Sequence, residues 1–102
     1  MSLKVWLLSL ALALPALPAL AEEEYDLLPE GPGKEEVFSA CSGCHSIRLV
    51  AQQGLDRGDW QETLTWMVEE QGMPELDPET EALVLGYLAQ HFNRDHRPAA
   101  AQ

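Results

Sequence analysis

The pentapeptide Cys41-Ser42-Gly43-Cys44-His45 constrains this 102-residue chain more than any other feature. Cysteines three residues apart on one helical turn place two thiols on the same side of the backbone. Each thiol can add across one vinyl group of a single porphyrin, and the histidine that follows can ligate its iron. The motif therefore predicts one covalently attached haem c, bound through Cys41 and Cys44, with His45 as the proximal axial ligand.

Three other uses of the cysteine pair fit the rest of the sequence less well. A thioredoxin-like redox pair needs a βαβ context, and no alternating apolar run here predicts a strand. A zinc site needs a second pair of ligands, for which His91 and His96 are the candidates. A disulfide across two intervening residues is strained, and it closes too short a loop to stabilise the fold much.

The first 21 residues have the pattern of a secretory signal peptide. Lys4 supplies a short basic region, Val5 to Leu14 form an apolar run interrupted by Ser9, and Ala19-Leu20-Ala21 matches a small-x-small cleavage site. The apolar run is shorter than the roughly 20 residues that a membrane span needs. Three glutamates follow Ala21 at once, which argues against retention of the segment as an anchor. We therefore expect cleavage, export to the periplasm and no membrane span in the mature chain.

Acidic residues dominate the charge, with 17 Asp and Glu against 6 Lys and Arg and a formal net charge of −11. Nothing in this composition would neutralise phosphates, so nucleic acid is excluded as a partner. The expected partner is a basic-faced redox protein that associates in a salt-dependent way. A chain of this length forms one small domain with little core, and a bound porphyrin would supply the apolar surface that it lacks.

Helical spacing of the apolar residues predicts an all-α domain of three main helices with long connections, wrapped around one covalent haem. The first helix is expected from Lys34 to about Cys44. The second opens at Asp56 and stops at Gly72, and it carries Trp60, Leu64, Met67, Val68 and Gln71 on its apolar side. The third opens at Asp77-Pro78 and presents Leu83, Val84, Tyr87, Leu88 and Phe92.

The remaining segments complete the predicted organisation of the chain. Residues 46–55 have no clear period and are expected to form a loop with at most one helical turn. The chain then divides into a signal peptide (1–21), an extended N-terminal arm ending in a loop (22–33), a haem domain (34–93) and a flexible tail (94–102).

Three features beside the motif resemble class I cytochromes c: Gly33 eight residues before Cys41, Phe38 just ahead of the motif, and Tyr87-Leu88-Ala89 in the last helix. In that family the first and last helices cross through such a glycine and aromatic residue, so the resemblance implies a cytochrome c domain. The chain departs from the family in having no proline soon after the motif. Because the carbonyl of that proline usually orients the proximal histidine, another carbonyl within 46–55 is expected to do so.

Met67 and Met73 are the candidates for the second axial ligand, with His91 a distant third. Met67 lies on the apolar side of its predicted helix, where a core methionine is the plain alternative, and Met73 lies in the loop that follows. The stretch from Cys41 to Met67 resembles the haem domain of quinohemoprotein amine dehydrogenases, where a tryptophan has the spacing of Trp60 and the distal ligand has the position of Met67. That resemblance implies Met67, and Met73 stays the alternative.

Trp60 and Trp66 are expected to pack in the core, with contact of Trp60 to the haem edge or a propionate as the alternative. Arg48 and Arg57 are candidates to pair with a propionate, and solvated surface pairing is at least as good an interpretation.

Longer runs resemble the small cytochrome c subunit of periplasmic sulfite dehydrogenases, namely 41–46, Leu49-Val50, Gln52-Gln53 and 66–78. In that family a molybdopterin subunit oxidises sulfite and passes electrons singly to the haem. The resemblance implies that this chain is the haem subunit, an electron-transfer protein without catalytic residues of its own. The alternative is a free-standing carrier between a dehydrogenase or cytochrome complex and a terminal oxidase. A haem sensor or peroxidase would require a weak or absent sixth ligand.

Overall fold

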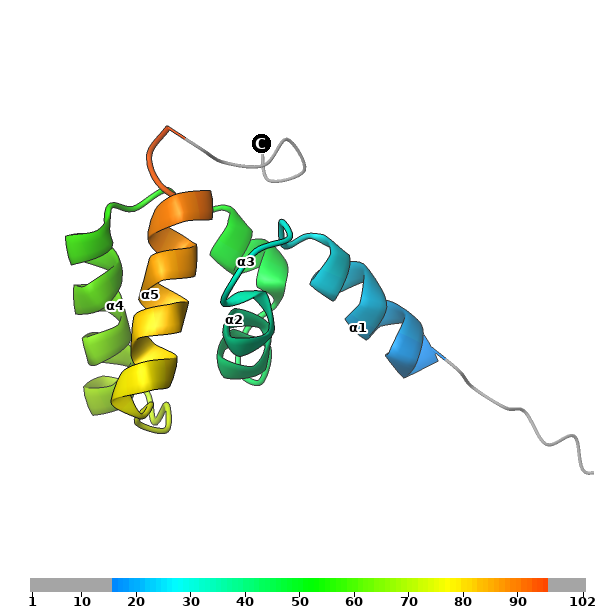
Figure 1. The fold of residues 1–102 in the computed structure, drawn as a ribbon. Coiled ribbons are helices and arrows are strands. Elements are labelled where there is room, and N and C mark those ends of the chain that lie inside the picture. The colour runs from blue at the N-terminus through cyan, green and yellow to red at the C-terminus, as the bar shows by residue number, and fades with distance from the viewer. Residues whose placement is uncertain (1–15, 96–102) are drawn as a thin grey trace, which may run out of the picture.

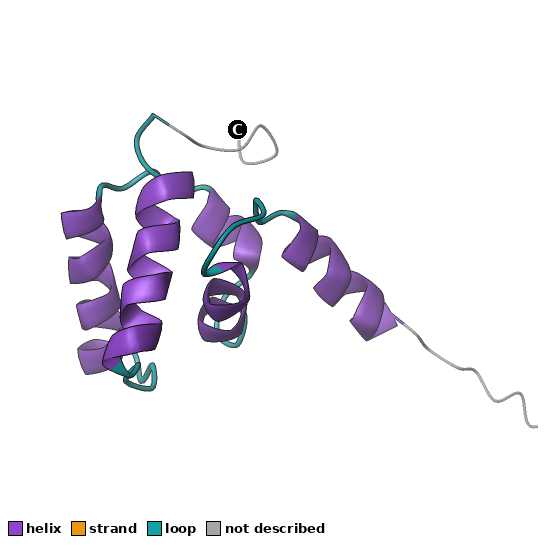
Figure 2. Cartoon of the chain, viewed as in Figure 1, coloured by secondary structure: helices purple, strands orange, loops and turns teal. Residues whose placement is uncertain are grey.

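A computed structural model describes the backbone of residues 16–95 and the side chains from Ala21 onward, and this part contains helices and no strand (Figures 1 and 2). The helices are α1 (Ala16–Asp26), α2 (Lys34–Cys41), α3 (Ile47–Ala51), α4 (Arg57–Glu70) and α5 (Pro78–His91). The predicted all-α class is therefore confirmed. None of the helices within residues 16–95 is long and apolar enough to cross a membrane. Most of the predicted signal peptide and tail, with His96, lies outside the described residues.

The helices α2 to α5 form the body of the molecule, and α1 projects away from it (Figure 1). In Figure 1, α4 and α5 lie side by side, and α2 and α3 stand next to them. Contacts between elements follow the same arrangement, because α5 packs against both α2 and α4, while α3 packs against α1 and α2. The last helix is thus the central element of the fold.

The two longest helices of the body begin and end where the sequence signals predict. Asp56 caps α4, because its Oδ1 accepts a hydrogen bond of 2.9 Å from the backbone N–H three residues on. Asp77 caps α5 in the same way, accepting from the backbone N–H of Thr80 at 2.8 Å, and Pro78 occupies the first helical position. Beyond the end of α4, Gly72 has a left-handed φ of 75°.

Helix α2 is shorter than predicted. It ends at Cys41 rather than near Cys44, so the second thiol and His45 lie in the turn that follows. Ser46 then caps α3 by accepting a hydrogen bond of 3.2 Å from the N–H of Arg48. The single short helix α3 agrees with the prediction of one helical turn within residues 46–55.

The predicted extended arm is wrong for residues 22–26, which form the end of α1. Tyr25 holds this helix against α2, since its ring meets Phe38 edge-on with centroids 5.3 Å apart and lies 4.0 Å from the Nζ of Lys34. Glu24 also accepts a hydrogen bond of 2.6 Å from the hydroxyl of Ser46. The loop predicted for the end of the arm is present at residues 27–33.

The buried core forms around α5 and is wider than the predicted apolar stripe. Leu83, expected in that stripe, is 37% exposed, whereas Leu85 is only 3% exposed. Because α5 is covered by α2 on one side and α4 on another, a broader arc of its surface is buried. The other core residues are Leu28, Val37, Ile47, Val50, Ala51, Trp60, Leu64, Val84, Tyr87, Leu88 and Phe92.

Helices α2 and α5 meet at Gly33, immediately before α2. A Cβ atom added there would lie 2.6 Å from the carbonyl oxygen of Leu83 and 2.9 Å from the Cβ of Tyr87. Gly33 also has a φ of 96°, in the left-handed region that glycine adopts most readily. A side chain at this position would force the two helices apart. Gly33 and Tyr87 therefore lie in close contact where α2 and α5 meet.

Candidate functional site

The Cys-x-x-Cys-His motif spans the end of α2 and the turn after it. The N–H of His45 donates to the carbonyl of Cys41 at 3.4 Å, which keeps this turn compact. Cys41 is half-buried, whereas Cys44 and His45 are exposed. Both cysteines are free thiols rather than a disulfide.

A cavity of about 250 Å³ brings the predicted haem-binding residues together. Cys41, Cys44 and His45 reach it from α2 and the following turn, and Met67 and Met73 reach it from α4 and the loop beyond. The rest of its wall is mostly apolar and consists of Ala40, Val50, Trp60, Leu64, Gln71 and Leu88. The five side chains that the sequence predicts as haem attachments or axial ligands therefore line the same cavity.

A second cavity, of about 580 Å³, adjoins the first, because Ala40, Cys44 and Met73 line both. The larger cavity alone falls within the roughly 300–1,000 Å³ that cofactor and ligand pockets occupy. The donor set fits a haem c, since it offers two thiols for thioether bonds, an imidazole and a thioether for the axial positions. Within residues 21–95, no group of three or more His, Cys, Asp or Glu side chains could hold a metal ion by itself.

The two cysteines differ in their surroundings. Burial, and to a lesser degree the neighbouring Cys44, raises the pKa of the Cys41 thiol to about 11. Cys41 is consequently protonated at neutral pH. A protonated, half-buried thiol is a weak nucleophile, so its reaction depends on how closely a partner group is held against it.

The end of α4 folds back so that both methionines reach the cavity. The carbonyl of Met67 accepts the N–H of Gln71 at 3.0 Å and the N–H of Met73 at 3.1 Å. Met67 and Met73 are each half-buried and line the same space as His45. The fold thus brings both candidates for the sixth ligand to the site.

The tryptophans have opposite environments. Trp60 is 3% exposed, lines the cavity, and donates its indole N–H to the carbonyl of Phe92 at 3.0 Å. The same carbonyl accepts the backbone N–H of Leu55 at 3.1 Å, so it joins the end of α5 to the segment before α4. Trp66 is 53% exposed, and its predicted packing in the core is wrong.

The other side chains considered from the sequence lie away from this cavity. His91 does not line it: its ring is 4.5 Å from that of Tyr87, and burial lowers the pKa of its imidazole. Its Nε2 is buried, has no hydrogen-bond partner among the described residues, and sits 3.0 Å from where a Cβ on Gly31 would be. Arg48 and Arg57 are exposed and are not in the cavity wall.

Sequence reasoning missed two features of the site. Ser46, the residue after His45, donates a hydrogen bond from its hydroxyl to Glu24 of α1, a contact that spans 22 positions and leaves no local signal. Val50 contributes to the cavity wall from α3, a helix too short to show a periodic pattern.

No protein-family model matches the chain, and neither a curated protein nor a solved structure matches it.

Proposed function

We propose that this chain is an exported, monohaem c-type cytochrome that carries one electron at a time. The observation that carries the proposal is the cavity where Cys41, Cys44 and His45 meet Met67 and Met73. Haem c attachment needs two thiols and an imidazole in this order, and a stable carrier needs a second ligand opposite the imidazole. The mostly apolar wall would exclude water from a bound porphyrin.

The roles of the residues follow from their chemistry. Cys41 and Cys44 would hold the haem, each adding its S–H across one vinyl group so that a C–S bond forms and the hydrogen goes to the other vinyl carbon. This addition needs no oxidant. His45 would ligate the iron through its imidazole, and Met67 or Met73 would do so through its thioether. When bound, the haem iron provides a one-electron redox couple, and a thioether ligand gives that couple a higher potential than two imidazoles would.

Side chains at both axial positions leave no coordination site for O₂ or peroxide, so the proposed role is electron transfer rather than catalysis. For the partner, we favour a periplasmic molybdopterin sulfite dehydrogenase, on the basis of the resemblance described above. The strongly acidic chain supports a partner with a basic face. A free-standing carrier between a dehydrogenase or cytochrome complex and a terminal oxidase is the alternative.

The test begins with the full chain, including residues 1–21, expressed in a bacterium that attaches haem c in its periplasm. We expect a red periplasmic protein whose mass exceeds that of the polypeptide by one haem and whose pigment resists acid–acetone extraction. Cys41→Ser and Cys44→Ser should each reduce covalent attachment, while Ser42→Ala, a control within the same motif, should retain it. A colourless exported protein would overturn the proposal.

The partner is tested with the protein from its native periplasm, purified at low salt. Prompt reduction of the visible haem bands by sulfite, with a molybdenum protein in the same fraction, would support the dehydrogenase subunit. A cytochrome that purifies alone and is reduced by dithionite but not by sulfite would favour the free-standing carrier. Ready binding of carbon monoxide to the ferrous protein would instead indicate an open coordination site.

A further inference from the structure

A cleft of about 170 Å³ lies between α4, the 71–77 loop and the start of α5. Leu64 and Met73 line both this cleft and the predicted haem cavity, so a single layer of side chains separates the two. Val68 and Leu76, which are half-buried, add to the apolar part of its wall. Any group bound in the cleft would therefore lie directly against a candidate axial ligand of the iron.

Carboxylates surround the apolar part of the cleft. They are Glu69 on α4, Glu75 in the loop and Glu81 on α5. Glu69 and Glu75 are exposed, and Glu81 is half-buried and accepts a hydrogen bond of 3.0 Å from Gln61. The ion pairs between described residues involve only Lys34 and Arg94 as cations, so none of these three glutamates is neutralised within residues 21–95.

The size and shape of the cleft match one long basic side chain. Its volume is below the roughly 300 Å³ at which small-molecule pockets begin. The three glutamates do not form a group that could hold a metal ion. Lysine and arginine combine an aliphatic stem, which packs on apolar surface, with a charged head that stays near water and carboxylates. The cleft offers both environments.

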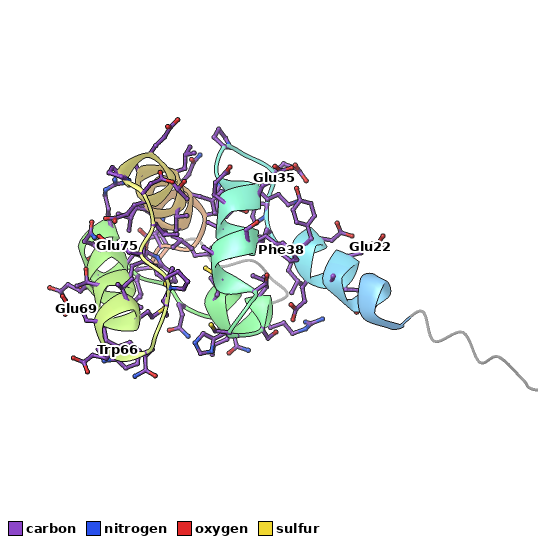
Figure 3. The ribbon with its side chains drawn as sticks, turned by 90° about the horizontal axis from the view of Figure 1, so that it is seen from below. Glu22, Glu35, Phe38, Trp66, Glu69 and Glu75 are labelled. Atoms are coloured by element: carbon purple, nitrogen blue, oxygen red, sulfur yellow. The ribbon has the colours of Figure 1, made fainter. Side chains whose placement is uncertain are left out.

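An exposed aromatic ring lies beside the cleft. Trp66 is next to Thr65, which lines the cleft, and one helical turn before Glu69. Figure 3 shows Trp66, Glu69 and Glu75 together on the side of the molecule opposite Glu22 of α1. A large apolar side chain that is 53% exposed next to a cleft with acidic residues in its wall has the composition of a protein-docking surface, in which tryptophan and arginine often contribute most of the binding energy.

We infer that this cleft receives a lysine or arginine side chain of a basic-faced redox protein, with Trp66 as the adjoining apolar contact. The inference rests on the proposed function and assigns a docking surface to it. Binding there would place the partner next to Met73, separated from the haem cavity by Met73 and Leu64. The acidic rim would steer the encounter and make it dependent on ionic strength.

The experiment uses the ferrous, ¹⁵N-labelled holo-protein and, as the probe, unlabelled ferrous mammalian cytochrome c, a soluble lysine-rich redox protein. At low ionic strength we expect amide shifts at residues 64–81 that disappear in high salt. The triple variant E69Q/E75Q/E81Q should weaken binding about tenfold, because three charges in the wall of the cleft are lost. Trp66→Ala should weaken binding while leaving its salt dependence unchanged.

The matched control is E22Q/E23Q/D26N, which removes three exposed acidic charges from α1. It should change the affinity less than threefold, because these residues lie away from the cleft. Equal weakening by the two triple variants, or shifts centred on α1 or α2, would overturn the docking surface. Failure of the docking surface alone would leave normal haem bands and normal reduction by dithionite in every variant. Failure of the proposed function would instead show as the absence of covalent haem.

Discussion

The backbone N–H of Met73 donates a hydrogen bond to the carbonyl of Met67, with 3.1 Å between nitrogen and oxygen. This contact turns the chain back at the end of α4 and leaves both thioether side chains in the wall of one cavity. Either sulfur could then be the second axial ligand of a bound haem iron. Comparing the two single variants decides between them.

We expect Met67→Ala to lower the reduction potential and to let carbon monoxide bind the ferrous protein, because the resemblance described above implies Met67 as the distal ligand. Met73→Ala is the matched control and should leave the potential and the visible spectrum nearly unchanged. The measurements are redox titration and carbon monoxide difference spectra. The reverse pattern would identify Met73 as the axial ligand.

Gly33→Ala should destabilise the fold by about 3 kcal/mol. Left-handed backbone costs a residue with a side chain roughly 1–2 kcal/mol, and overpacking adds about 1–3 kcal/mol. The methyl group would lie 2.6 Å from the carbonyl oxygen of Leu83. Gly86→Ala should have the opposite effect, since nothing lies within 4 Å of its Cβ position and alanine favours a helix by roughly 0.5–1 kcal/mol. Urea unfolding of both variants measures the difference, and equal effects would contradict the crossing at Gly33.

Trp60→Phe should cost about 1–2 kcal/mol of unfolding free energy, because it removes a buried hydrogen bond to Phe92 and part of the core. Trp66→Phe is the control and should change stability by less than roughly 0.5 kcal/mol, as expected for an exposed position. Thermal or urea unfolding followed by circular dichroism distinguishes the two. A larger loss for Trp66→Phe would show that its ring is part of the core.

The stability of the protein should fall with acidification through the titration of His91. Burial lowers the folded-state pKa of its imidazole below the usual 6.5, so the unfolded chain binds a proton more readily than the folded one. This contribution is complete above pH 6.5 and is lost as the pH falls through the lowered folded-state pKa. The ring of Tyr87 and the backbone at Gly31 pack against His91, and neither supplies a negative charge there.

His91→Phe keeps a ring against Tyr87 but removes the titrating group. Its unfolding free energy should therefore decline less steeply than that of the wild type below pH 6.5, as measured by urea titrations at a series of pH values. His45 and the carboxylates are common to both proteins and cancel in the comparison. Parallel pH profiles would show that His91 is not linked to folding.

Local signals predicted the helix starts well, because a cap is made within three or four residues. Asp56 and Asp77 predict the starts of α4 and α5, because their side chains accept hydrogen bonds from nearby backbone N–H groups. Cys41, Cys44 and His45 line one cavity, as their closeness in the sequence leads one to expect, and their attachment to haem stays a prediction. The meeting of Met67 with Met73 depends on a turn at Gly72, which the sequence also marks.

Tertiary contacts explain what the sequence could not predict. The end of α1 is helical where acidic residues suggested an extended arm, and Tyr25 attaches it to Phe38 of α2. Leu85 is buried because both α2 and α4 pack against α5. A prediction from one apolar stripe assumes that the helix packs against a single partner. Trp60 and Trp66 both lie on α4, and which of them is buried depends on which side of that helix faces α5. The helical pattern of α4 alone does not decide this.

The carbonyl of Phe92 accepts hydrogen bonds from both the indole of Trp60 and the backbone N–H of Leu55. One oxygen atom thus binds the end of α5 to the wall of the cavity and to the segment that leads into α4. If Trp60 moved away from the end of α5, its buried indole N–H would lose its acceptor, and if Leu55 moved away its backbone N–H would lose the same acceptor. The Leu55 amide should consequently exchange its hydrogen with solvent only when the whole helical body opens, which makes it a natural probe of global unfolding.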